Sequence, residues 1–216
     1  MKLLFENWRK FLKEEVAAFH GVDMKPQAMN KKGDLPACDE PPEFDTGDKA
    51  VKNKEHGYYD NQWDAGEKGC PQFTHERGIG SDHKDIHQAI EFLDNVRPDE
   101  LIAYSRGGAV ALAALPSAAH QPHVTFVAPA WKRGWVTDIE NPFYSNGVII
   151  HGTEDKFVPL SHSADLSLRT GMDLYVFDGL GHINILKQKL NPTSGRLLSQ
   201  EEKEELVRGD TNETPI

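Results

Sequence analysis

Between residues 81 and 190, short apolar runs alternate with segments whose apolar residues recur every three or four positions. The short runs have the length of strands, and the three-to-four spacing is typical of amphipathic helices. Strands that alternate with helices form right-handed units on a parallel sheet, so the pattern predicts an α/β domain. The predicted strands are residues 101–104, 123–127, 147–150 and 173–177, and the predicted helices are residues 81–96, 106–115, 162–169 and 183–190.

The N-terminal segment has a pattern of its own. Its apolar residues, from Leu4 to Phe19, are spaced three and four apart, and Lys and Glu fill the other positions. This spacing predicts an amphipathic helix over residues 3–19. Two interpretations stay open: a helix docked on the domain, or a detachable docking or packaging segment. The stretch MKLLFENWRKFLKEE is similar to leader segments on proteins of large tailed bacteriophages, where such a segment can direct packaging into the capsid.

Residues 21–80 show no periodicity, because prolines, glycines and charged residues interrupt it. We expect an irregular N-terminal third, in which only residues 50–51 and 72–74 could form short strands. Residues 199–216 predict a short acidic helix and a disordered tail. The predicted organisation is an N-terminal helix over residues 1–20, a single α/β domain over 21–198 and an acidic tail over 199–216.

Charge and hydropathy exclude some partners. The net charge is -10 and the mean hydropathy is -0.58. The sequence has no clustered basic patch, so neither a nucleic acid nor an anionic membrane is an expected partner. No apolar stretch reaches the ~20 residues that span a bilayer, and Glu6, Arg9 and Lys10 interrupt any signal-peptide core. We therefore expect a cytoplasmic protein. Cys38 and Cys70 form no CxxC pair, which excludes a zinc ribbon and leaves one disulfide or two free thiols open.

Ser105 lies on a tight turn between a predicted strand and a predicted helix. Small residues, Ala103 and Gly107, stand two positions before and after it. A sharp strand-to-helix turn needs small residues there because its neighbours come very close, and the turn lifts the serine hydroxyl above the sheet. The N-terminus of the next helix would point free N–H groups at the same place. Ser105 is the candidate nucleophile, and a glycine-rich turn without chemistry is the alternative.

Two further loops follow predicted strands and carry an acid and a base. Asp155 lies in the stretch HGTEDKFVP, with Glu154 as the neighbouring candidate, and His182 ends the stretch GLGH. Imidazole is the natural general base at neutral pH. Because sites in parallel sheets form at the carboxyl ends of strands, Asp155 is well placed to orient His182.

Together these loops resemble the α/β-hydrolase fold family. The order Ser105, Asp155, His182 is the order of that family, and HGTEDKFVP and GLGH resemble its acid and histidine loops. The resemblance covers residues 78–190. It implies a reduced α/β-hydrolase fold with a mostly parallel sheet flanked by helices, and a serine hydrolase that cleaves acyl esters or thioesters through an acyl-enzyme.

The same resemblance gives further expectations. The connection over residues 129–146 is too short for a lid, which points to an open-site carboxylesterase or thioesterase with a small acyl substrate and neither metal nor organic cofactor. The alternative is a catalytically weak or inactive hydrolase-like protein that serves as a binding or virion-associated module. A phage-encoded protein would act in the host cytoplasm or in the virion. The sequence does not indicate an oligomeric state.

The oxyanion hole is the part of the family pattern that this sequence matches least. The resemblance makes the backbone N–H of Arg106 the first donor, since Arg106 follows the nucleophile. The second donor is expected in a His-Gly-x loop after an early apolar strand. By position we favour His56-Gly57-Tyr58, which makes the Tyr58 amide the donor, and His20-Gly21 is the rival. Ala103 replaces the first glycine of the family's turn, a change that is sterically tolerable.

Two other groups of residues could carry function. His83, His87 and Glu91 are four apart and could share a helix face as a metal patch, but a solvated helix face explains them better and no metal is expected. Trp131 and Trp135, followed by Phe143 and Tyr144, could line an acyl pocket or cover the edge of the sheet. Both interpretations of these aromatic residues stay open.

Overall fold

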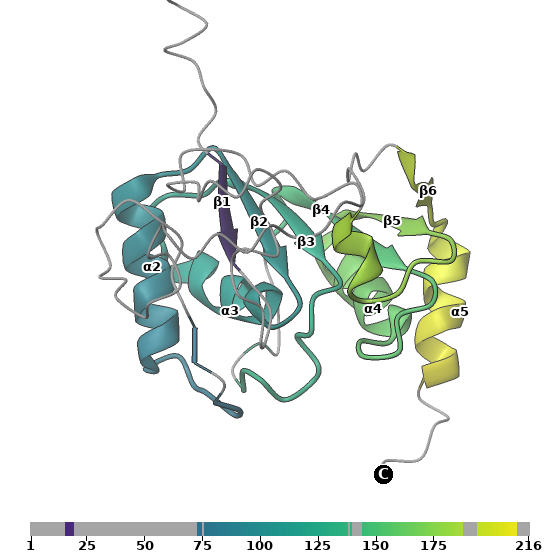
Figure 1. The fold of residues 1–216 in the computed structure, drawn as a ribbon, viewed down its shortest axis with the longest axis horizontal. Helices are drawn as coiled ribbons and strands as arrows, with labels where there is room; N and C mark the ends of the chain where they lie inside the picture. The colour runs from purple at the N-terminus through teal and green to yellow at the C-terminus, as the bar shows by residue number, and fades with distance from the viewer. Residues whose placement is uncertain are drawn as a thin grey trace, which may run out of the picture.

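The computed structural model describes residues 16–19, 73–74, 76–137, 139, 144–187 and 194–210. Its centre is a six-stranded sheet in which each strand pairs with the next one along the chain (Figure 1). The strands are β1 (Val16–Phe19), β2 (Glu100–Tyr104), β3 (His123–Val127), β4 (Gly147–Gly152), β5 (Asp173–Phe177) and β6 (Arg196–Leu197). The first five strands run parallel and β6 is antiparallel to β5.

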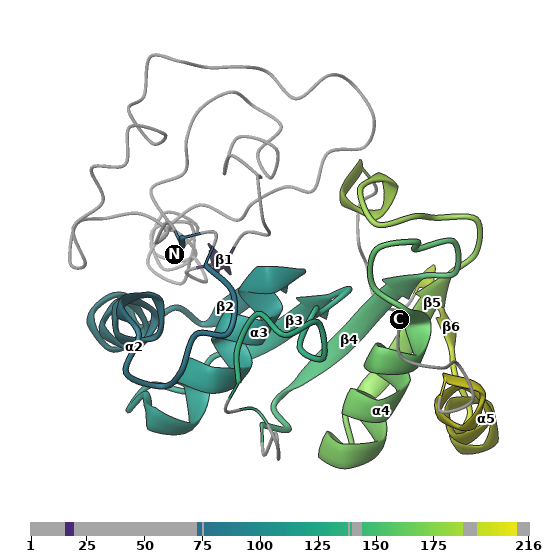
Figure 2. The same ribbon diagram turned by 90° about the horizontal axis from the view of Figure 1, so that it is seen from below.

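The helices lie along one side of this sheet (Figure 2). They are α2 (Lys84–Val96), α3 (Arg106–Ala114), α4 (Leu160–Thr170) and α5 (Gln200–Asp210). Two 3-10 turns, η2 (Leu115–Ser117) and η3 (Asn184–Lys187), complete the described helical elements. Right-handed crossovers between strands that are added in one direction place every connecting helix on the same side. The predicted α/β class and mostly parallel sheet are therefore confirmed, and so are the four predicted strands.

The helix predicted over residues 3–19 is wrong for residues 16–19, which form β1. This strand pairs in parallel with β2, so that Phe19 lies opposite Ala103. The stretch Val-Ala-Ala-Phe is continuously apolar, and a short run of that kind has no period that separates a buried strand from a buried helix. The ring of Phe19 is fully buried and packs edge-on against Phe73 at 5.1 Å between ring centres. Residues 1–15 lie outside the described part of the chain.

Two smaller expectations also change. The helix predicted over residues 183–190 is a 3-10 turn at Asn184–Lys187, and residues 188–190 lie outside the described residues. Residues 73–74 belong to no strand, whereas residues 50–51 are not described. The short acidic helix after residue 199 is confirmed as α5, and residues 211–216 are not described.

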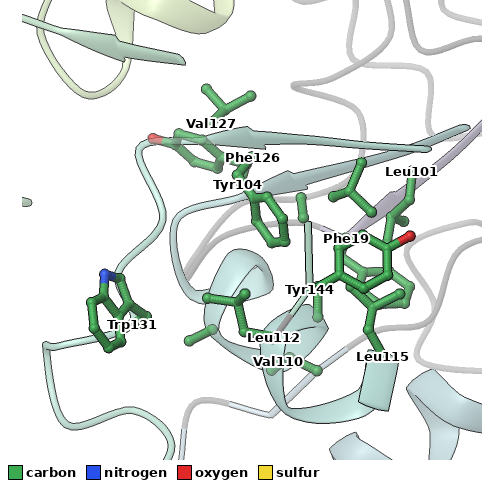
Figure 3. Packing of buried hydrophobic residues seen from close by; sticks show 14 of the residues in the cluster. Phe19, Leu101, Tyr104, Val110, Leu112, Leu115, Phe126, Val127, Trp131 and Tyr144 are labelled. Atoms are coloured by element: carbon green, nitrogen blue, oxygen red, sulfur yellow. The ribbon is translucent and has the colours of Figure 1, made fainter. Parts of the chain in front are cut away.

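A continuous core joins the sheet to α3 (Figure 3). Four residues of β2, from Leu101 to Tyr104, are buried, and so is almost all of α3. Burying a large apolar side chain stabilises a fold by ~1.5–3 kcal/mol, so this packing holds the end of β2 and the start of α3 firmly. The turn between them, which carries Ser105, is therefore flanked on both sides by buried core residues.

Candidate active site

Ser105 occupies the sharp turn that the sequence predicts between β2 and α3. Its φ of 51° and ψ of -118° lie in a region that residues other than glycine rarely adopt. The turn is held by backbone hydrogen bonds: Ser105 N–H donates to Val127 O at 2.9 Å, and Ala130 N–H donates to Ser105 O at 2.9 Å. Strain that the surroundings fix in this way is typical of functional sites.

The structure brings Ser105, His182 and Asp155 into one hydrogen-bonded row. Nδ1 of His182 lies 2.6 Å from Asp155 Oδ2, and Nε2 lies 2.9 Å from Ser105 Oγ. An ionised carboxylate only accepts hydrogen bonds, so Nδ1 carries the proton and donates it to Asp155. Nε2 of the neutral ring is then left to accept the hydroxyl proton of Ser105, which is the arrangement a general base requires.

Asp155 is fixed by several donors. Its Oδ1 accepts the backbone N–H groups of Phe157 at 2.8 Å and Val158 at 2.9 Å, and its side chain is 1% exposed. Burial alone would raise its pKa, but hydrogen bonds from His151, His182 and the Val158 backbone outweigh burial and hold the pKa of Asp155 well below its ordinary value. Asp155 is therefore ionised throughout the neutral range and can stabilise a positive charge on His182.

The loops that carry Asp155 and His182 are tied directly to each other. Glu154 N–H donates to Leu180 O at 2.9 Å, and Thr153 N–H donates to Phe177 O at 3.1 Å. Gly152 permits this contact, because a Cβ atom at that position would come within 2.1 Å of Leu180 O. The glycine that follows His151 thus serves close packing between the acid loop and the histidine loop.

Aromatic rings enclose His182 and the backbone near it is anchored. The ring of Tyr104 lies 4.9 Å from that of His182, and the ring of Phe157 lies 5.6 Å away. The Tyr104 hydroxyl donates to His182 O at 3.0 Å. Burial, and then the charge of Asp155, raise the pKa of Tyr104, so it remains a hydrogen-bond donor. Tyr104 therefore fixes the histidine loop against the end of β2.

His151 is a neighbour of the site that sequence reasoning did not single out. Its side chain is fully buried, and Nε2 lies 3.0 Å from Val158 O and 3.4 Å from Asp155 Oδ2. Because both neighbours are acceptors, Nε2 carries a proton, and Nδ1 meets Ser163 Oγ at 2.7 Å. A polar residue at the end of the apolar run Val148–Ile150 was the available signal.

A cavity of about 540 Å³ opens beside Ser105. The predicted substrate residue Trp135 is part of its wall, whereas Trp131 is not among the described lining residues. The indole N–H of Trp131 instead donates to His162 O at 2.8 Å, and Trp131 is buried (Figure 3). The wall consists of Arg77, Tyr104, Ser105, Ala130, Arg133, Trp135, Phe157, Val158, His182 and Ile183.

The backbone N–H and the side chain of Arg106 have different roles. It is the first residue of α3, so its backbone N–H has no partner within the helix and remains the predicted first oxyanion donor. Its side chain is 1% exposed and points away from solvent to Asp85, which is fully buried, with Nη2 at 2.7 Å from Oδ2. The backbone N–H and the hydroxyl of Thr74 both donate to the same oxygen of Asp85, each at 2.9 Å.

Asp85→Ala is expected to lower the free energy of unfolding by about 3–5 kcal/mol, because it leaves the Arg106 guanidinium buried without its partner. Urea unfolding of the wild type and the variant measures the difference. The double variant Asp85→Leu with Arg106→Met should lose much less, because replacing both charges by apolar groups removes the uncompensated charge. A single variant as stable as the wild type would contradict this account of the pair.

The second oxyanion donor stays a prediction. Both His56-Gly57-Tyr58 and His20-Gly21 lie outside the described residues. The position of β1 nevertheless bears on the choice, because Phe19 pairs with Ala103, two residues before Ser105. The sequence that directly follows β1 is His20-Gly21, so a described apolar strand precedes this rival, whereas the residues before Tyr58 are not described.

Other sequence candidates have structural roles or are not described. His83 is the N-cap of α2, where its Nδ1 accepts the Asp85 N–H at 3.1 Å, and no group of metal-binding side chains occurs among the described residues. Within the described ranges, no helix is both long and apolar enough to cross a membrane. Cys38, Cys70 and Phe143 lie outside the described residues. Tyr144 is buried, and its hydroxyl donates a hydrogen bond to Pro122 O.

The parallel sheet, the strained serine turn after β2, and the acid and histidine after β4 and β5 define a reduced α/β-hydrolase fold. No protein-family model matches the sequence, and a search of curated proteins gives no significant match. Among solved structures, the chain is similar to a predicted CIB-like hydrolase from Thermoplasma acidophilum, at 18% identity and a TM-score of 0.48, over 91% of this chain and 84% of that one.

A second similar structure is an alpha-beta serine hydrolase homologue from Coxiella burnetii, at 16% identity and a TM-score of 0.40. The match covers 66% of this chain and 63% of the Coxiella protein, so it spans less than two thirds of that protein. Neither structure is described as a bacteriophage protein, and the similarity of the N-terminal segment to phage leaders stays a prediction.

Proposed function

We propose that the protein is a serine hydrolase that cleaves acyl esters or thioesters through an acyl-enzyme intermediate. One observation carries the proposal: the hydroxyl of Ser105, on its strained turn at the cavity, donates to His182 Nε2 at 2.9 Å, and Asp155 orients His182 at 2.6 Å. A serine, a neutral imidazole and an ionised carboxylate in this order form an activated nucleophile.

In the proposed reaction, Ser105 Oγ attacks the acyl carbonyl while His182 Nε2 takes the hydroxyl proton. The C–O or C–S bond to the leaving group then breaks, and His182 returns the proton to the departing alcohol or thiol. Water attacks the acyl-enzyme with His182 again as base, which releases the acid and restores Ser105. Asp155 holds the Nδ1–H tautomer of His182 and stabilises the imidazolium.

The negative charge on the carbonyl oxygen needs donors. The Arg106 N–H is the proposed first donor, and the second comes from His20-Gly21 and the residue after it or from Tyr58. Each such donor contributes ~2.7–4 kcal/mol to the transition state in serine hydrolases. The connection between β3 and β4 supplies Ala130, Arg133 and Trp135 to the cavity wall, which supports an open site for a small acyl substrate rather than one beneath a separate lid.

A panel of p-nitrophenyl esters tests the proposal. The protein is expected to hydrolyse p-nitrophenyl acetate and butyrate with an initial burst of about one equivalent of p-nitrophenol per site, because the acyl-enzyme accumulates. It should act more slowly on the laurate ester and on a peptide p-nitroanilide. A matched butyryl thioester should also be cleaved. Rates no higher than the buffer background for every ester would instead support the alternative, a hydrolase-like binding or virion-associated protein.

A further inference from the structure

Two arginines, Arg77 and Arg133, stand in the wall of the cavity next to Ser105. Both side chains are exposed. Arg77 lies in the loop before α2, and Arg133 lies in the loop after β3. The whole protein has a net charge of -10, yet the described lining residues include neither an aspartate nor a glutamate. Among the described residues, the mouth of the cavity is therefore a local positive region on an acidic protein.

The two loops are joined by their backbones, which places the arginines on the same side. Gly78 N–H donates to Gly134 O at 2.9 Å. These glycines follow Arg77 and Arg133 directly, and their φ angles of 65° and 69° lie in the left-handed region that favours glycine. The paired turns thus fix the directions in which the two arginine side chains leave the backbone.

Arg77 is also held by its neighbours. Its guanidinium lies 4.1 Å from the ring centre of Trp135, and Nη1 lies 3.5 Å from Arg133 O. Stacking on an indole leaves the edge of the guanidinium available for hydrogen bonds. Among the described residues, Arg106, Arg169 and Arg196 form ion pairs with carboxylates, whereas Arg77 and Arg133 do not.

Arg133 has a fixed relation to the nucleophile. Ala130 N–H donates to Ser105 O at 2.9 Å, and Arg133 N–H donates to Ala130 O at 3.1 Å. The turn that presents Arg133 therefore begins on the backbone of Ser105 itself. A group bound by Arg133 and Arg77 would be held at a set position relative to the reacting hydroxyl.

We propose that the substrate of this site carries an anionic group, a carboxylate or a phosphate, that Arg77 and Arg133 bind while the acyl carbonyl meets Ser105. The inference rests on the proposed function of the same site and narrows its substrate to acidic acyl esters or thioesters. Arginine suits this role because its planar fork binds carboxylate and phosphate oxygens in pairs.

Two esters that differ in charge and by one methyl group test the inference: p-nitrophenyl hemiadipate, which ends in a carboxylate, and methyl p-nitrophenyl adipate, which ends in a methyl ester. The wild type is expected to have a kcat/KM at least about tenfold higher for the acidic ester, the gain of a charged hydrogen bond. The double variant Arg77→Gln with Arg133→Gln should reduce this ratio to near 1, and high salt should reduce it in the wild type.

The matched control is Arg97→Gln. Arg97 is exposed like the two cavity arginines but caps the end of α2, before β2 begins and so at the opposite end of the sheet from Ser105. This variant should keep the wild-type ratio. Equal kcat/KM for the two esters in the wild type, or a preference that the double variant retains, would overturn the inference.

Calorimetry with the Ser105→Ala variant separates this inference from the proposed function. Monomethyl adipate and propyl phosphate are titrated in turn, with dimethyl adipate as the neutral control. Binding of either anion that exceeds the neutral control and is lost with Arg77→Gln and Arg133→Gln supports the site, and the tighter ligand identifies the anion. Such binding without any ester hydrolysis refutes only the proposed function, whereas Ser105-dependent hydrolysis with no anion preference and no anion binding refutes only this inference.

Discussion

Ser105→Ala is expected to lower kcat/KM for p-nitrophenyl butyrate by at least about 10³-fold, because it removes the attacking oxygen. Alanine fits the turn as serine does, since both carry a Cβ at the same positive φ. The thermal unfolding midpoint should therefore stay close to that of the wild type. Initial rates and a thermal unfolding curve on the same preparations separate the loss of chemistry from a loss of fold.

Ser161→Ala is the matched control for this substitution. Ser161 and Ser105 are equally buried, each 7% exposed, but the Ser161 hydroxyl donates to Asp210 at 2.7 Å and lies outside the cavity wall. The control should retain wild-type rates. If Ser105→Ala kept about 10% of the wild-type rate, far more than remains when a nucleophile is removed, Ser105 could not be the nucleophile.

Asp155→Asn is expected to reduce kcat by about 10⁴-fold with little change in shape. The amide would donate to His182 Nδ1 and stabilise the tautomer that carries its proton on Nε2. That tautomer cannot accept the Ser105 proton, although the 2.6 Å and 2.9 Å contacts are otherwise preserved. Steady-state kinetics measures the loss, and Asp173→Asn, at the exposed start of β5, should be without effect.

The same variant has a predicted pH signature. Folding lowers the pKa of Asp155, so its ionised form stabilises the fold at pH values above its unfolded pKa of about 3.9. This contribution is lost as the pH falls from there through the folded pKa. The stability difference between the wild type and Asp155→Asn should thus be constant near neutrality and shrink in acid. A difference that grows on acidification, or a variant with wild-type kcat, would contradict the assigned role.

Much of the fold and of the site could be predicted because local sequence patterns indicate it. The strands β2 to β5 are short apolar runs, and Ser105, Asp155 and His182 each follow one of them. In a parallel sheet the carboxyl ends of neighbouring strands lie along one edge. Sequence order alone therefore places the three residues close together, and small residues around Ser105 mark its turn.

What the sequence could not supply depends on partners far along the chain. The strand β1 exists because Val16–Phe19 pairs with β2, more than eighty positions away, and nothing in the local spacing requires that pairing. The pairing of the Gly78 and Gly134 turns, which aligns Arg77 with Arg133, is equally non-local. Trp131 and Trp135 look alike in sequence, and only the course of the loop after β3 separates a core residue from a cavity residue.

The central claim is that Ser105 is a nucleophile activated by His182. Labelling with a fluorophosphonate, followed by peptide mapping with mass spectrometry, tests it most directly, because the probe reacts covalently only with an activated serine. We predict that the wild type is modified at Ser105 and that the modification is absent from Ser105→Ala and strongly slowed in Asp155→Asn. Failure to label the wild type at Ser105, or labelling that persists in Ser105→Ala, would contradict the account.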